Sequence, residues 1–205
     1  MENIPLFEAI DTLRAVRRFS SAAVPEDAIH KVIEAASHAT SGGNRQPWHV
    51  VVVRDPELKR RLGEFYWKAT QENRARGLHR ETPTFLRTGW DMAQHIGESP
   101  VILIVCAEGE ESFFIGSSIY PFAQMLMLAA RGLGLGTCFT TNHRRFEKEV
   151  KELLGIPAGW ITACLIPLGY PGEGEKFGGA RRKPVEAIAS YDRWGQHPHS
   201  KAKAS

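Results

Sequence analysis

Apolar positions recur at two spacings along the chain, and each spacing predicts a different kind of element. A recurrence every three to four residues, which places side chains on one helical stripe, predicts helices over residues 5–16, 25–39, 56–70, 85–95, 114–133 and 144–154. Short apolar or β-branched runs predict strands over residues 48–53, 101–106, 137–141 and 161–168, and a short strand-like run at 185–190. Polar residues 71–83, interrupted by Gly77 and Pro83, predict a mobile connection.

These helices and strands mix without strict strand–helix–strand alternation, which indicates an α+β fold. We predict a central, mostly antiparallel sheet of about four or five strands flanked by helices. One domain is expected over residues 1–195, followed by a polar tail over 196–205 that is expected to be disordered. The helix at 114–133 is largely apolar all round, so it must be covered by its own core or by a second subunit.

Composition narrows the classes of function. The hydrophobic fraction of 42% and the charged fraction of 24% are ordinary for a globular domain, and a net charge of +3 argues against a nucleic-acid partner. The first residues resemble no signal peptide, and we find no apolar stretch long enough to cross a bilayer, so no membrane partner is expected. Cys106, Cys138 and Cys164 lie in apolar runs without metal-ligand spacing. They predict buried free thiols, a reducing compartment and therefore the cytoplasm, with no metal site.

Two basic clusters stand out. Arg14, Arg17 and Arg18 end the first predicted helix, where Arg14 and Arg17 would share a face and could grip one anion. The alternative for this feature alone is a solvated helix end that complements the dipole. The run 181–183 (Arg-Arg-Lys) is likewise either a solvated charge run or, beside Arg14 and Arg17, the rest of a phosphate clamp.

Two loops also carry candidate chemistry. Residues 41–48 (SGGNRQPW) combine glycines, which allow close approach of a ligand, with neutral donors and acceptors, although Ser/Gly/Asn-rich connections are common. Residues 132–137 (GLGLGT) contain spaced glycines, but a dinucleotide fingerprint requires a strand before it and a helix after it. The order here is reversed. These glycines are expected to end the long helix and to let the next strand pack closely, while 139–142 offer backbone N–H groups to a ligand.

Together and in this order, these groups resemble the nitroreductase family of FMN-dependent oxidoreductases. The resemblance covers about residues 7–194 and rests on RAVRRF (14–19), SGGNRQPW (41–48), AARGLGLGT (129–137), IPLGYP (166–171) and RRKP (181–184). It implies an intertwined homodimer with two FMN sites at the subunit interface. It also implies NAD(P)H as the electron donor.

The resemblance assigns roles position by position. Arg14 and Arg182 match residues on the FMN phosphate, and Arg17 matches the basic residue near flavin N1 and O2. Ser41 and Asn44 match contacts from the partner subunit. The segment whose backbone faces flavin N5 corresponds to Thr140 and Thr141. The complete set expected to bind the cofactor is Leu13, Arg14, Ala15, Arg17, Ser41, Gly42, Asn44, Gln46, Thr140, Thr141, Arg181 and Arg182.

Three positions depart from the family pattern. Leu13 stands where a further arginine is usual, Ala15 where serine is frequent, and Thr40 where proline precedes the serine. Side-chain contacts at 13 and 15 therefore do not transfer. The phosphate clamp is expected to depend more on Arg14, Arg181 and Arg182.

The implied reaction moves a hydride from NAD(P)H through flavin N5 to a small organic acceptor such as a nitroaromatic or a quinone. The sequence requires no protein acid or base. Region 65–95 is expected to line the acceptor pocket, although core packing is the better explanation for at least half of its aromatic candidates: Phe65, Tyr66, Trp67, Phe85 and Trp90. The alternatives are a flavin-dependent dehalogenase, a flavin-fragmenting synthase, or a flavin-binding protein without turnover.

Overall fold

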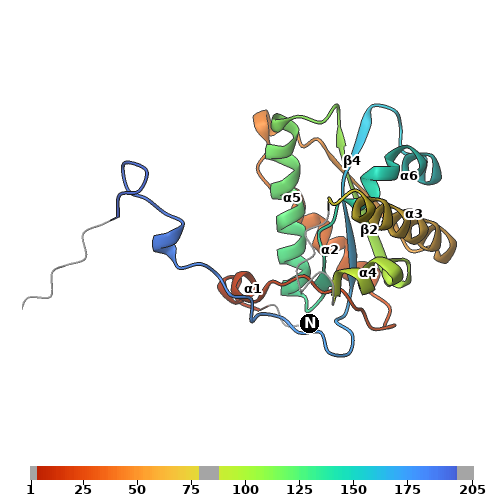
Figure 1. The fold of residues 1–205 in the computed structure, drawn as a ribbon, viewed down its shortest axis with the longest axis horizontal. Helices are drawn as coiled ribbons and strands as arrows, with labels where there is room; N and C mark the ends of the chain where they lie inside the picture. The colour runs from red at the N-terminus through yellow and green to blue at the C-terminus, as the bar shows by residue number, and fades with distance from the viewer. Residues whose placement is uncertain (1–3, 79–87, 198–205) are drawn as a thin grey trace, which may run out of the picture.

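The centre of the fold is a four-stranded antiparallel sheet with the strand order β1-β2-β4-β3 (Figure 1). The computed structural model describes residues 4–78 and 88–197. The strands are β1 (Trp48–Val53), β2 (Val101–Glu108), β3 (Gly136–Thr137) and β4 (Trp160–Gly169). The α+β class and the antiparallel sheet expected from the sequence are confirmed.

Helices cover both faces of this sheet. The helices in the described ranges are α1 (Leu6–Thr12), α2 (Glu26–Ser37), α3 (Pro56–Ala75), α4 (Trp90–His95), α5 (Phe113–Gly132) and α6 (Glu147–Leu154). Helices α2 and α5 lie on one face, and α3, α4 and α6 lie on the other (Figure 1). A core on each side explains why β2 is a continuous apolar run: Leu103 and Val105 face one core, while Ile102 and Ile104 face the other.

Local sequence sets the limits of the long helices. The Asp55 side chain accepts a hydrogen bond from the Leu58 N–H, and Pro56 occupies the first helical turn of α3. The predicted mobile connection begins too early, because residues 71–75 continue α3 as good helix formers. The helix ends before Gly77, whose φ of +68° closes the turn. Residues 79–87, which include the rest of that connection and Phe85, lie outside the described residues.

Three further predictions are corrected. The predicted strand over 137–141 has only its first residue within β3, and Thr140 forms an isolated bridge to Leu165. A 3₁₀ helix, η4 (Asn142–Phe146), precedes α6, so that helix begins at Glu147 rather than at 144. Residues 185–187 form a 3₁₀ turn rather than a strand, because no neighbouring strand in the described chain pairs with them.

Helix α1 ends four residues earlier than predicted, and the reason concerns the site. From Leu13 the chain becomes extended and runs beside β3, where Ala15 pairs in parallel with Thr137. Arg14 and Arg17 therefore do not share a helical face. Gly136 permits this close approach, since a Cβ there would lie 2.6 Å from the Val16 Cβ. The expectation that the glycine run ends α5 and lets the next strand pack closely is correct.

Helix α5 is apolar enough to resemble a membrane span. Its 20 residues have the length and hydropathy of one, which corrects the expectation that the chain contains no such stretch. It packs along α2 and the sheet through Ile119, Phe122 and Leu126, as a core helix does. Phe113 and Phe114 at its beginning are 87% and 82% exposed, so one chain leaves part of it uncovered.

The chain after Gly178 extends away from the body as a C-terminal arm, residues 179–197 (Figure 1). Its apolar side chains are exposed, and Trp194 is 100% exposed. Ile188 and Tyr191 are exposed as well. Side chains of this kind gain stability only when another surface covers them. The predicted disorder of the polar tail over residues 196–205 stays a prediction, because residues 198–205 lie outside the described ranges.

Replacing Gly136 by Ala tests the contact that holds the extended segment against β3. The added Cβ meets Val16 below van der Waals distance, so we expect Gly136→Ala to lower the free energy of unfolding by about 1–3 kcal/mol. Urea denaturation measures the change. Gly159→Ala is the control, because nothing lies within 4 Å of a Cβ at that position. Equal denaturation midpoints for the two variants would contradict the prediction.

Candidate functional site

The extended segment over residues 13–20 is held between β3 and the chain that follows β4. On one side, the Val16 N–H donates to Thr137 O at 2.9 Å. On the other side, the Gly172 N–H donates to Arg18 O, also at 2.9 Å. The backbone that carries the arginines of this segment is therefore hydrogen-bonded on both of its sides.

The carboxylate of Glu175 also holds this segment. Glu175 Oε1 accepts hydrogen bonds from the backbone N–H groups of Arg17 and Arg18, each at 3.2 Å. Hydrogen bonds to an ionised acceptor are stronger than neutral ones. Glu175 thus satisfies two backbone donors and leaves both guanidinium groups available for other contacts.

Arg14 contacts the beginning of the C-terminal arm. Its Nη1 donates to Gly178 O at 3.1 Å, while the Gly178 N–H donates to Thr12 O at 2.7 Å. The predicted neighbours Leu13 and Ala15 flank Arg14; all three are half-buried, and Ala15 pairs with Thr137. Arg14 therefore lies where the arm that carries Arg181 and Arg182 begins.

Arg17 is a half-buried cation for which the described residues supply no ion-pair partner. Its guanidinium has no hydrogen-bond or ion-pair partner within residues 4–78 and 88–197, although the residue is half-buried. Burial raises the pKa of the Tyr66 phenol and of the Cys138 thiol, and the Arg17 charge opposes both shifts, so Arg17 lies within electrostatic reach of both groups. An unpaired, half-buried guanidinium is a favourable contact for an anionic ligand.

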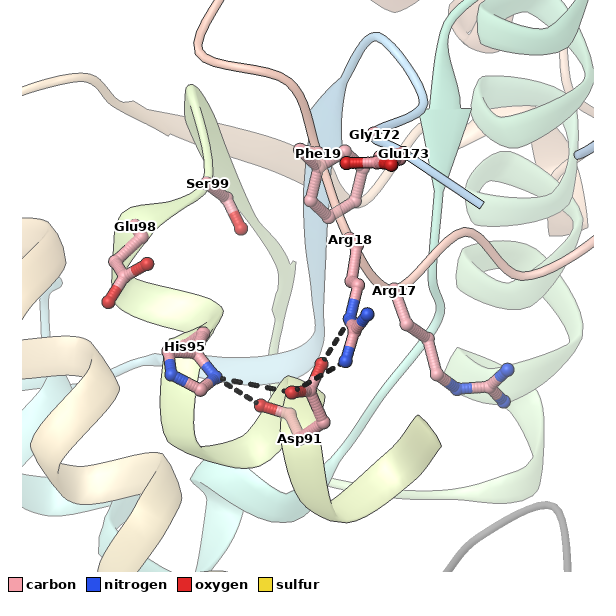
Figure 2. A pocket seen from close by; sticks show the side chains of 9 residues that line it. All are labelled: Arg17, Arg18, Phe19, Asp91, His95, Glu98, Ser99, Gly172 and Glu173. Atoms are coloured by element: carbon pink, nitrogen blue, oxygen red, sulfur yellow. Dashed lines mark hydrogen bonds and ion pairs between the residues drawn. The ribbon is translucent and has the colours of Figure 1, made fainter. Parts of the chain in front are cut away.

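Arg18 is neutralised by a partner far along the chain. Its Nε and Nη2 donate to the two carboxylate oxygens of Asp91 at 2.8 and 3.1 Å, and His95 Nδ1 lies 3.7 Å from Asp91 Oδ1 (Figure 2). The hydrogen bond from Arg18 lowers the pKa of Asp91. These residues and Arg17 line a cavity of about 330 Å³, and Figure 2 shows the Arg17 guanidinium turned away from Arg18. The ion pair fastens α4 to the arginine segment.

The backbone N–H and carbonyl of Thr140 are both used in hydrogen bonds to β4. Its N–H donates to Leu165 O at 3.1 Å, and its carbonyl accepts from the Leu165 N–H at 2.9 Å. Its hydroxyl lies 2.7 Å from the Tyr66 hydroxyl. Of the two predicted threonines, Thr141 is the one whose N–H has no partner among the described residues, and it is exposed.

The loop over residues 41–46 is organised by its own side chains. Ser41 Oγ accepts from the Gln46 N–H at 3.1 Å, and Gln46 Nε2 donates to Asn44 Oδ1 at 3.2 Å. Asn44 and Gln46 have φ values of +54° and +49°, which side chains other than glycine rarely adopt. Strained backbone of this kind is concentrated at functional sites.

One chain does not bring this loop to the arginine segment. The Gly42 N–H donates to Ser118 Oγ near the beginning of α5, whereas Arg131 Nε donates to Thr12 Oγ1 near its end. Ser118 and Arg131 are 13 positions apart in α5, which corresponds to about 20 Å along the helix. The predicted site is thus divided into two halves at opposite ends of α5.

The arm leaves the other predicted arginines in solvent. Arg181 and Arg182 are exposed, and the one contact of their side chains in the described chain is from Arg182 Nη1 to Arg181 O at 3.5 Å. The predicted clamp with Arg14 and Arg17 is therefore not formed within one chain. The reason is that, among the described residues, no hydrogen bond or ion pair joins either guanidinium to the body of the domain.

The described aromatic residues of region 65–95 pack against other side chains of the protein. Tyr66 is buried, Phe65 stacks on Phe146, and Trp67 meets Trp90 edge to face with ring centroids 4.8 Å apart. Core packing accounts for these residues, as the sequence favoured for at least half of them. The expectation that this region lines an acceptor pocket is not tested by these contacts.

Comparison with known proteins decides the family. A model of the Nitroreductase family matches residues 10–170. The chain belongs to the nitroreductase family.

Two curated relatives of this nitroreductase-family chain extend the comparison. Iodotyrosine deiodinase 1 of Rattus norvegicus is 28% identical over 200 residues, covering 92% of this chain and 70% of the relative. A protein of Archaeoglobus fulgidus provisionally named NADH dehydrogenase/NAD(P)H nitroreductase is 29% identical over 180 residues, covering 82% and 86%. Members with different named activities are thus similarly distant from this chain.

A solved structure agrees with the fold. Oxidized iodotyrosine deiodinase bound to FMN and 3-iodo-L-tyrosine superposes with a TM-score of 0.78 at 23% identity, covering 93% of this chain and 100% of that one. At this identity the similarity establishes the fold alone.

Sequence reasoning missed several residues that shape the site of this nitroreductase-family protein. Glu175 and Asp91 hold the arginine segment from positions 158 and 73 residues away in sequence, and nothing in their local sequence distinguishes them from surface carboxylates. Tyr66 was one of the pocket candidates for which core packing was the alternative, and the sequence did not predict that its hydroxyl contacts Thr140. Each contact depends on tertiary structure.

Proposed function

We propose that this protein is a homodimeric, FMN-dependent oxidoreductase that transfers a hydride from NAD(P)H to a small organic acceptor such as a nitroaromatic or a quinone. The observation that carries the proposal is Arg17: a half-buried guanidinium without a partner in the described chain, on backbone fixed by β3 and Glu175. Membership of the nitroreductase family supports the same conclusion. The three buried free cysteines support a cytoplasmic location.

The residues present fit FMN. An anionic cofactor with a phosphate at one end needs cations at two places, and the chain supplies Arg17 at one and Arg14, Arg181 and Arg182 at the start of the arm. When bound, FMN supplies the redox chemistry itself, taking a hydride from NAD(P)H at N5 and passing electrons to the acceptor.

The protein residues bind and orient. Arg17 stabilises negative charge at the N1/O2 edge of the ring, which matters most in a site that excludes water. Thr140 and Thr141 would lie at the N5 edge, where the Thr141 N–H, which has no partner among the described residues, would be free to donate. Arg14 and Arg182 bind the phosphate, remote from the reacting atoms. The protein supplies no acid or base in this account.

A second copy of the chain completes the site. The two halves of the site lie at opposite ends of α5, so an antiparallel partner along α5 would bring Ser41, Gly42, Asn44 and Gln46 of that partner to Arg14 and Arg17. The exposed apolar residues support this arrangement, because they lie on α1, at the beginning of α5 and on the arm. These exposed residues include Phe7, Phe113, Phe114, Ile188 and Trp194.

A dehalogenase is the second candidate function. It is favoured by the similarity to iodotyrosine deiodinase 1 over 92% of this chain. The two functions share the cofactor and differ in the acceptor, so they are separated by the acceptor alone.

Purified protein is expected to be yellow and to release FMN on heating. Anaerobic addition of NADH or NADPH should bleach the bound flavin, and a nitroaromatic or a quinone should restore the colour over many turnovers. Chromatography identifies the cofactor, and absorbance at the flavin band follows both steps. Released FAD, or flavin that no nicotinamide reduces, contradicts the proposal. Turnover with halogenated phenols alone favours the dehalogenase.

The arginines are expected to divide into two roles. Arg14→Ala and Arg182→Ala each remove a charged phosphate contact worth about 1.5–3 kcal/mol, so FMN affinity falls roughly tenfold to a hundredfold and saturating FMN restores turnover. Arg17→Ala removes charge stabilisation that grows as the flavin is reduced, so added FMN cannot compensate. A lower midpoint potential and slower reduction by nicotinamide are expected at full occupancy.

Stopped-flow reduction and potentiometry on the loaded variants measure these effects. Arg76→Ala, at an exposed position after α3, is the control for loss of one positive charge. If the midpoint potential of Arg17→Ala equals that of this control, Arg17 does not contact the reacting ring.

A further inference from the structure

Arg131, in the last turn of α5, is the one buried arginine among the residues that the structure describes, and it is 8% exposed. A basic side chain at this end of a helix complements the helix dipole, but an exposed side chain does so equally well. Removing a guanidinium from water costs free energy, which the contacts around it must offset. The burial of Arg131 is therefore explained only by the groups that it contacts.

Two contacts hold the Arg131 guanidinium, and both are made by chain that flanks Arg14. Its Nε donates to Thr12 Oγ1 at 2.9 Å, and its central carbon lies 4.0 Å from the centroid of the Phe177 ring. A guanidinium stacked on an aromatic face makes a favourable cation–π contact. The ion pair with Glu8 is long, at 4.0 Å, and Glu8 is half exposed, so it adds little. The stack and the hydrogen bond therefore fix Arg131.

Thr12 connects Arg131 to two other parts of the chain. Its hydroxyl donates to Glu8 O at 2.5 Å, which uses its single hydrogen, so Thr12 Oγ1 can only accept from Arg131. The Thr12 carbonyl accepts from the Gly178 N–H at 2.7 Å. The last residue of α1 thus joins the end of α5 to the chain that follows β4.

Gly178 is the residue at which these contacts reach Arg14. Its carbonyl accepts from Arg14 Nη1 at 3.1 Å. Gly178 and Gly179 have φ values of +72° and +71°, so the chain makes a tight turn here in a conformation that favours glycine. A Cβ at position 178 would lie 3.5 Å from Thr12 Cγ2, which shows that the turn packs on Thr12. The direction of the Arg14 guanidinium therefore depends on how this turn is held.

We propose that Arg131 is a positioning residue for the phosphate end of the flavin site. Stacked on Phe177 and bonded to Thr12, it holds the turn at Gly178 that aims Arg14. Arg131 touches neither cofactor nor substrate and acts through these neighbours. This inference rests on the proposed FMN site and adds to it a buried residue at the end of α5.

Titration of the full-length apoprotein with FMN and with riboflavin tests this role, because riboflavin has the same ring system without the phosphate. Arg131→Met keeps an unbranched side chain and removes both the cation of the stack and the hydrogen-bond donor. We expect FMN affinity to fall about tenfold, the lower end of the loss expected for Arg14→Ala, and riboflavin affinity to stay within about twofold of the parent. Flavin fluorescence during the titration gives both dissociation constants.

Phe177→Leu tests whether Arg131 acts through its neighbours. It leaves the Arg131 charge in place and removes the aromatic face, so the same selective loss of FMN affinity is expected. In the Arg14→Ala background, Arg131→Met should lower FMN affinity by less than about twofold further, since the group that it aims is absent. Phe177 is only partly buried, so its variant decides the question if Arg131→Met does not fold.

Arg54→Met is the matched control for loss of one arginine. Arg54 follows β1, at the edge of the sheet opposite β3, and forms an ion pair with the exposed Glu26. Its affinities for FMN and for riboflavin are both expected to equal those of the parent.

An FMN affinity in Arg131→Met equal to that of Arg54→Met overturns the positioning role and leaves the proposed function intact. Equal losses of FMN and riboflavin affinity overturn it too, because they indicate a general loss of structure. Parent-like FMN affinity in Phe177→Leu, or full additivity with Arg14→Ala, contradicts action through the neighbours. Parent protein that binds no FMN overturns the proposed function itself.

Discussion

The hydrogen bonds between the extended segment over residues 13–20 and β3 are the constraint on which the rest of the site depends. The bond from Val16 to Thr137 places Arg14, Ala15 and Arg17 at the edge of the sheet instead of on a helix. Glu175 then fixes the backbone on the opposite side. Because these contacts satisfy the backbone, the Arg17 guanidinium remains available within electrostatic reach of Tyr66 and Cys138.

The same segment is also bonded to α4 and to the chain that leads into the C-terminal arm. Arg18 and Asp91 fasten it to α4, and Arg14 fastens it to the beginning of the arm at Gly178. What one chain cannot do is close the site, since the loop at 41–46 lies at the other end of α5. The position of the loop at 41–46 near the beginning of α5 and the exposed apolar side chains on α5 and the arm agree with the proposed dimer.

Much of the fold could be predicted from the sequence, and the errors have physical causes. The strands β1, β2 and β4 and the helices α2 and α5 follow from periodicity because burial and periodicity agree there. The predicted first helix was too long, because residues 14–16 have a spacing compatible with a helix. In the structure they pair with β3 instead. The motifs singled out the candidate arginines, and the roles of these arginines at a flavin stay predictions. The motifs could not reveal Glu175, Asp91 or the Tyr66–Thr140 contact, whose partners meet only in three dimensions.

The central claim is that a complete flavin site requires two chains. Native mass spectrometry of the FMN-loaded protein tests it most directly, since mass reports the number of chains and of cofactors together. The account predicts one species with two chains and two FMN, and apoprotein monomers on dissociation, because neither chain alone joins the loop at 41–46 to Arg14 and Arg17. A monomer that retains FMN at full occupancy would contradict it.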